Sequence, residues 1–70
     1  MLPLSDPLFH VEKLQGGRFV RQAERLDFAT ADRMARNLAE VETEMSIVRN
    51  TRTGILTSAY RRTETGLVAL

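Results

Sequence analysis

The chain has 70 residues, of which 43% are hydrophobic and 27% charged, and its formal net charge is +1. This length suits one small domain, and the composition is typical of an ordered chain and excludes general disorder. The absence of cysteine excludes a disulfide framework and a thiolate metal site. No apolar run approaches the ~18 residues that span a bilayer, and the start of the chain lacks the regions of a signal peptide, so we expect a cytoplasmic protein.

The first part of the chain predicts an arm followed by a hairpin. Pro3 and Pro7 favour extended backbone, so residues 1–7 are expected to form an N-terminal arm. The adjacent glycines at positions 16 and 17 supply the positive φ angles of a tight turn. We therefore predict strands at residues 8–14 and 18–26, the second of which extends as far as residue 28 if it outlasts its partner.

One convincing helix follows this hairpin. Thr30 is a good N-cap residue, and Asp32 suits the electrostatics of a first turn. Apolar residues then recur at three- and four-residue spacing from Ala31 to Val41, which predicts one apolar stripe. Acidic residues oppose the helix dipole at the far end, so the helix is expected to fray near Thr43.

The rest of the chain predicts a second hairpin, with strands at residues 45–49 and 55–61, and a short C-terminal tail at residues 63–70. The order makes residues 8–62 a single ββαββ domain of the α+β class, in which an antiparallel sheet of about four strands carries one helix on one face. Strand order is left open. The expected core residues are Met34, Leu38, Ile47 and either Phe19 or Val20.

Each expected strand contains two adjacent large apolar residues. Successive side chains of a strand point to opposite faces, so each pair offers one apolar group to each face of the sheet. These pairs are Leu8-Phe9, Phe19-Val20, Ile47-Val48 and Ile55-Leu56.

A single helix covers a single face, and the second face needs the tails, a second copy or a partner to cover it. Large exposed apolar patches are unusual in monomers, so we expect a homodimer or a complex with a host protein. The candidate residues for this dimer or partner face are Val48, Leu56, Leu67, Val68 and Leu70.

The sequence offers little for catalysis. His10 is the only histidine, and it is expected to be a half-exposed strand residue, because metal sites and catalytic triads need several converging groups. A domain this small also has little room for a deep pocket. We therefore expect no enzyme activity, no catalytic residues, no metal, no cofactor and no membrane partner.

A basic hairpin is the strongest polar candidate, since four arginines and no acid lie between residues 49 and 62. A two-stranded ribbon can enter a major groove, where arginine binds guanine or phosphate. However, one aromatic residue is nearby and the pI of about 8.4 is below that of strongly basic domains. A solvated hairpin, a protein-binding hairpin and a nucleic-acid-binding hairpin all stay open. The candidate partner-binding residues are Arg49, Arg52, Tyr60, Arg61 and Arg62.

Three hypotheses for function follow. The leading one is a non-catalytic protein-interaction module that dimerises, or that blocks a host protein, through the free sheet face or an exposed edge strand. The alternative is a small nucleic-acid-binding regulator that uses the arginine hairpin, and the third is an accessory subunit of a larger complex. In size and layout the chain is similar to many small proteins of phages and mobile elements, including some that inhibit host proteins. The likeness includes no shared motif.

Overall fold

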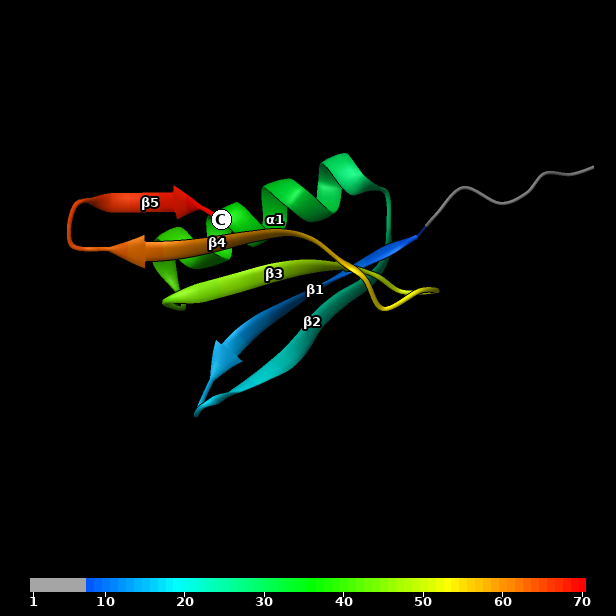
Figure 1. Ribbon diagram of the computed structural model, residues 1–70, viewed down its shortest axis with the longest axis horizontal. Coiled ribbons are helices and arrows are strands. Elements are labelled where there is room, and N and C mark those ends of the chain that lie inside the picture. Colours follow the sequence, from blue (N-terminus) through cyan, green and yellow to red (C-terminus); the bar gives the residue numbers. More distant parts are fainter. Residues whose placement is uncertain (1–7) are drawn as a thin grey trace, which may run out of the picture.

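The computed structural model describes residues 8–70 as one twisted antiparallel sheet with a helix on one face (Figure 1). The expected arm at residues 1–7 lies outside the described residues. The elements in chain order are β1 (Phe9–Gln15), β2 (Arg18–Leu26), α1 (Phe28–Val41), β3 (Met45–Asn50), β4 (Leu56–Thr63) and β5 (Gly66–Ala69).

The predicted α+β class and the antiparallel sheet are confirmed, with five strands where about four were expected. The additional strand is β5, which forms within the segment predicted as a tail. Thr63 pairs with Gly66 across a tight turn, and Gly66 has the positive φ of 132° that glycine adopts freely. The apolar residues that follow then pair with β4.

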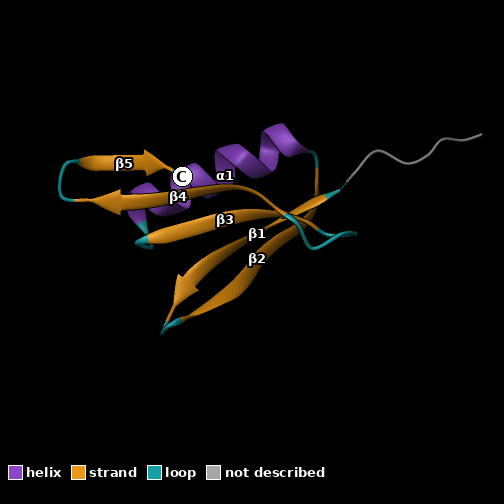
Figure 2. Cartoon of the chain, in the orientation of Figure 1, coloured by secondary structure: helices purple, strands orange, loops and turns teal. Residues whose placement is uncertain are grey.

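The strand order is β2-β1-β3-β4-β5. The chain leaves β2 at one edge, runs through α1, and returns as β3 beside β1, which makes β1 a central strand. Figure 2 shows α1 lying along one face of the sheet. The helix contacts β1, β3, β4 and β5, so it lies over the centre of the sheet and reaches the edge strand β5.

The helix begins earlier than the sequence predicts. Its N-cap is Asp27, whose carboxylate accepts a hydrogen bond from the Thr30 N–H at 2.7 Å. Thr30 therefore lies inside the first turn and is not the cap. At the other end the N–H groups of Glu42 and Thr43 both donate to the Leu38 carbonyl, which ends the helix near the expected residue.

Three alanines bring the helix close to the sheet. Ala31, Ala35 and Ala39 are spaced by one turn and are fully buried. The short side chains allow the hydroxyl of Ser46, on β3, to donate to the Ala35 carbonyl. The core beneath this ridge consists of Val11, Val48 and Tyr60 together with the three alanines.

This core differs from the predicted one. Ile47 is buried on the opposite face of the sheet, because its neighbour Ser46 points toward the helix. Phe19 and Val20 are exposed, and Met34 and Leu38 pack only against the margin of the core. Of the predicted apolar stripe, Ala31 and Ala35 face the sheet most closely, whereas Val41 at its end is 80% exposed.

A polar contact fixes α1 over β4. Asp32 accepts hydrogen bonds from the Ser58 hydroxyl at 3.0 Å and the Tyr60 hydroxyl at 2.6 Å. Arg36 lies over the Tyr60 ring, 5.5 Å from its centroid, which is cation–π geometry. The hydrogen bond to Asp32, and secondly burial, raise the pKa of the Tyr60 phenol above its ordinary value.

Enlarging the alanine ridge should destabilise the fold. We expect Ala35→Leu to lower the free energy of unfolding by about 1–3 kcal/mol, because a larger side chain pushes the helix off the sheet and strains the Ser46 hydrogen bond. Urea denaturation measures this difference. Ala29→Leu, on the exposed side of the same helix, is the matched control and should change the free energy of unfolding little. Equal stability of the two variants would contradict this placement of the helix.

Candidate functional site

The face of the sheet opposite α1, here called the open face, is the candidate functional surface. No helix or strand of residues 8–70 lies over it (Figure 1). Its residues follow from the register, because Ser46 faces the helix and cross-strand partners share a face. The side chains of this face are those of Leu14, Phe19, Met45, Ile47, Leu56, Ala59 and Val68, with His10, Glu12, Arg21, Arg49 and Arg61.

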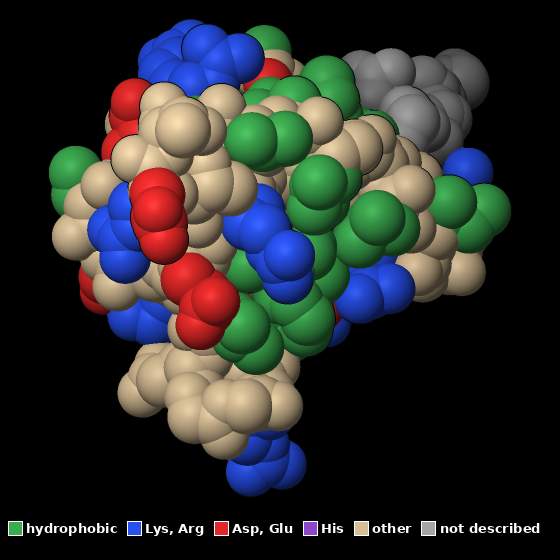
Figure 3. Space-filling model, turned by 60° about the vertical axis from the view of Figure 1, so that its left-hand side comes forward, with side chains coloured by type: hydrophobic (Ala, Val, Ile, Leu, Met, Phe, Trp, Pro, Cys, Tyr) green, Lys and Arg blue, Asp and Glu red, His purple; other side chains and the backbone are tan. Residues whose placement is uncertain are grey.

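Large apolar side chains are exposed at the margins of the open face. Phe19 on β2 is 39% exposed, and Leu56 and Val68 on the other side are 49% and 40% exposed. Leu70 directly follows β5, donates its N–H to the Ala59 carbonyl, and is 66% exposed. Figure 3 shows hydrophobic side chains gathered in a band with Lys and Arg side chains among them. An apolar surface of this kind, bordered by charge, is typical of a binding site.

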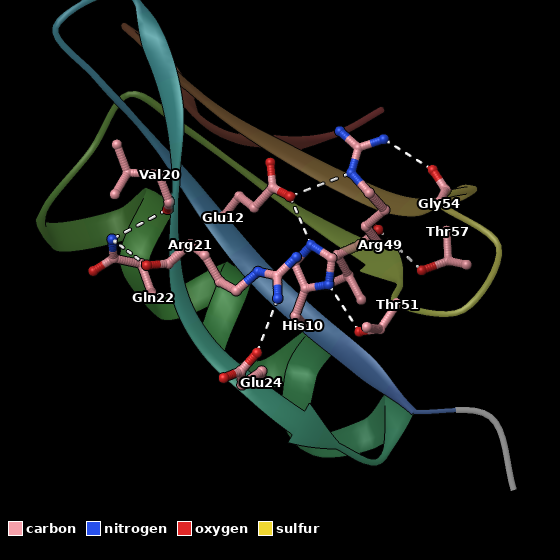
Figure 4. Close-up of polar contacts among 11 residues, drawn as sticks. His10, Glu12, Val20, Arg21, Gln22, Glu24, Arg49, Thr51, Gly54 and Thr57 are labelled. Carbon is pink, nitrogen blue, oxygen red and sulfur yellow. Dashed lines mark hydrogen bonds and ion pairs between the residues drawn. The ribbon is translucent and has the colours of Figure 1, made fainter. Parts of the chain in front are cut away.

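The centre of the open face is closed by a polar cluster around His10, which is only 2% exposed (Figure 4). Its Nε2–H donates to the Glu12 carboxylate at 2.6 Å, and its Nδ1 lies 2.8 Å from the Thr51 hydroxyl. Glu12 also accepts a hydrogen bond from Arg49 Nε at 3.3 Å, and Arg49 donates to the Gly54 carbonyl at 3.0 Å. We call these four side chains, of His10, Glu12, Arg49 and Thr51, the clasp.

The clasp holds Glu12 in its charged form. Burial by itself raises the pKa of this carboxyl, but the hydrogen bond from His10 and the charge of Arg49 outweigh it. The pKa of Glu12 therefore lies below its ordinary value of 4.5. The ionised carboxylate ties together β1, β3 and the loop at residues 51–55.

The order carboxylate, imidazole, hydroxyl is also the order of a catalytic triad. A triad needs free N–H groups near the hydroxyl to stabilise an oxyanion. Here the N–H of Thr51 donates to the Leu8 carbonyl, and those of Arg52, Thr53 and Gly54 all donate to Asn50. With these donors engaged, the geometry supports a structural clasp that fastens the loop to β1.

The five residues of the predicted arginine hairpin do not share one surface. Arg49 and Arg61 lie on the open face. Arg62 points to the helix side, where it donates to the Glu40 carbonyl at 3.2 Å, and Arg52 lies in the β3–β4 loop. Tyr60 is buried against α1 and hydrogen-bonded to Asp32, so its ring is not free to stack on a base.

Only three of the five residues predicted for the dimer or partner face lie on the open face. Val68 and Leu70 lie beside the far half of β4 on the open face, and Leu56 is on the same face at the start of β4. Val48 is fully buried in the core, and Leu67 packs against the core from the helix side. The five-residue set therefore spans both faces, because alternate residues of β5 point in opposite directions.

The sequence predicts that His10 is half-exposed, and this prediction is wrong. His10 is buried, and both of its ring nitrogens have hydrogen-bond partners. The spacing of His10 and Glu12 by two residues places them on one face of β1 and was the available signal. Arg49 and Thr51 come from a different strand and the following loop, so only the register reveals them.

An open groove of about 310 Å³ runs along one flank of α1. Met34 and Leu38 form its floor, since both pack partly against the core, while Val41 at its end is 80% exposed. Among residues 8–70 the lining consists of Thr30, Arg33, Met34, Asn37, Leu38 and Val41. The groove is shallow and lacks the buried, converging polar groups of a small-molecule site.

Residues 8–70 contain no cluster of three or more His, Asp or Glu side chains that could hold a metal ion. Within the same range no helix is long and apolar enough to cross a membrane. No family model, no curated protein and no solved structure matches this chain.

The lowered pKa of Glu12 predicts a loss of stability in acid. A carboxyl whose pKa is lower in the folded state contributes stability above its unfolded pKa of about 4.5, and this contribution disappears as the pH falls through the folded value. We expect Glu12→Gln to cost about 1–3 kcal/mol at pH 7, with the difference from the wild type shrinking below pH 4. Urea denaturation from pH 7 to pH 3 measures it. Glu64→Gln, in the exposed β4–β5 turn, is the control, and equal pH profiles for all three proteins would contradict the role of the clasp.

Proposed function

We propose that this chain is a non-catalytic protein-interaction module whose open face binds an acidic, partly apolar surface of another protein. The observation that carries the proposal is the set of exposed apolar side chains at the margins of this face, beside arginine. A helix buries the other face, and the clasp gives the centre of the open face a fixed shape. A preformed surface of this kind binds without the cost of ordering its backbone.

The charges on the open face favour an acidic partner. The open face carries three arginines, and one of them, Arg21, is paired with Glu24 at 2.9 Å. Arg49 is already paired with Glu12, whereas Arg61 makes no ion pair within residues 8–70. Two copies meeting face to face would bring like charges together, which disfavours that arrangement. An acidic surface would pair with Arg61 while covering the apolar margin.

We further propose that the partner is a host protein and that the chain inhibits it. This part of the proposal rests on the similarity in size and layout to small phage and mobile-element proteins. The open face is suited to this role because blocking a host surface requires area and complementarity and no chemistry. The accessory-subunit hypothesis uses the same face, with a partner inside a stable complex.

The open face should bind a small anionic apolar probe. We expect anilinonaphthalene sulfonate, titrated into the native protein at pH 7, to shift the amide NMR signals of Phe19, Arg61 and Val68. Phe19→Ser should weaken binding by about tenfold, which corresponds to about 1.4 kcal/mol of lost apolar contact. Fluorescence titration gives the affinity, and NMR gives the site.

Val41→Ser is the control for this experiment, since Val41 is an exposed apolar residue that lies in the α1 groove and away from the open face. It should leave the affinity for the dye unchanged. NMR shifts confined to the groove, or equal affinities for the wild type and Phe19→Ser, would count against the open face as the binding surface.

Nucleic-acid binding is the second candidate, favoured by Arg49 and Arg61 on one face. We expect no binding of duplex or single-stranded probes in gel-shift assays even at low salt, because Tyr60 is buried and Arg62 faces the helix side. Binding that weakens steeply with salt would support this candidate instead. Glutamine at all four hairpin arginines should then abolish binding.

A further inference from the structure

The two edges of the sheet are built differently. The edge strand β2 carries four charged residues, and its pairing with β1 contains two register irregularities. One residue in this irregular part, Arg25, has a φ of 62°, which bends the strand away from straight pairing. Charges and bulges of this kind prevent another strand from adding to an edge.

The opposite edge strand, β5, has none of these protections. Its sequence from Gly66 to Ala69 contains no charged residue and no proline, and its pairing with β4 is regular. Figure 1 shows β5 at the outer margin of the sheet. An uncharged, regular edge is a template for the addition of a further strand.

The outward hydrogen-bonding groups of this edge can be identified. The N–H of Leu70 donates inward to the Ala59 carbonyl at 2.9 Å. Backbone groups of successive strand residues point alternately to the two sides, so Val68 also bonds to β4 while Leu67 and Ala69 point outward. The outward N–H and C=O groups of Leu67 and Ala69 are therefore available to another strand.

We propose that β5 pairs antiparallel with β5 of a second copy of this chain, about a two-fold axis at Val68. In this register Leu67 lies opposite Ala69 of the second copy. Each such pair exchanges both of its N–H···O bonds, so every outward group meets a partner. The two sheets join into one continuous sheet, with both helices on the same side.

The edge itself indicates a second copy as the occupant. A two-fold interface must be self-complementary, and β5 satisfies this because it carries no charge and offers Leu67 and Ala69 symmetrically about Val68. The open face lacks this property because its arginines would meet each other. Stable interfaces bury about 800 Å² on each partner, which a four-residue edge does not reach, so the dimer is expected to depend on concentration.

This dimer goes beyond the proposed function because it uses the edge of the sheet and leaves the open face free. It places the open faces of two copies side by side, which doubles the surface available to a partner. The exposed Val68 and Leu70 of each copy then lie near the middle of the joined surface.

The experiment is light scattering and sedimentation of the full chain at concentrations from micromolar to millimolar. The wild type should pass from monomer to dimer over this range. Ala69→Pro removes an outward N–H without removing a bond to β4, and it should raise the dissociation constant about tenfold or more, since each copy loses one donor. Ala69→Ser keeps the N–H and should dimerise like the wild type.

Charge variants at Val68 test the two-fold axis directly. Val68→Lys and Val68→Asp should each be monomeric, because identical charges would face each other across the axis. A one-to-one mixture of these two variants should form a heterodimer. A monomeric wild type at all concentrations, a dimer unaffected by Ala69→Pro, or a mixture that stays monomeric would overturn the proposal.

The dye titration separates this proposal from the proposed function. Phe19→Ser should weaken dye binding and leave dimerisation unchanged, whereas Ala69→Pro should do the opposite. Loss of dimerisation in Phe19→Ser, with Ala69→Pro unaffected, would place the contact between copies on the open face and overturn the edge pairing.

Discussion

The close approach of α1 to the sheet is the contact on which the rest of this structure depends. It requires a ridge of small residues, Ala31, Ala35 and Ala39, and it is fixed by the hydrogen bond from Ser46 to the Ala35 carbonyl. A helix seated so tightly over the middle of the sheet buries the central part of one face, around Val11, Val48 and Tyr60. It also commits the only helix of residues 8–70 to that face, so the second face depends on the side chains of the sheet itself.

The second face meets this constraint with polar groups at its centre and apolar groups at its margins. In the clasp, both ring nitrogens of His10 have partners and the Glu12 carboxylate accepts from His10 and Arg49, while Ile47 on the same face is only 2% exposed. Desolvating such groups would be costly without these partners. The margins have no equivalent cover within residues 8–70. Structural requirements therefore account for the centre of the open face, and its exposed margins are the part on which the proposed binding function rests.

The two edges of the sheet differ in the same way, since one is protected from a further strand and the other is available to it. On β2 the irregular pairing and the charges limit strand addition, whereas β5 leaves the backbone groups of Leu67 and Ala69 pointing outward. The acidic partner proposed for the open face and the second copy proposed for the β5 edge differ in chemistry. The two proposed contacts therefore use different parts of the sheet.

The sequence by itself determined the local features of this protein: the turn at Gly16 and Gly17, the helix with its apolar stripe, the α+β class, and the surplus of apolar side chains over what one helix can cover. These features depend on periodicity and turn chemistry, which neighbouring residues specify. Only the tertiary structure decided the strand order, the fifth strand, the burial of His10 and the separation of the arginines onto two faces. Each of these depends on how the strands pair and in which register. A shift of one residue moves every side chain of a strand to the other face. Long-range packing selects the register, and the local sequence does not specify it.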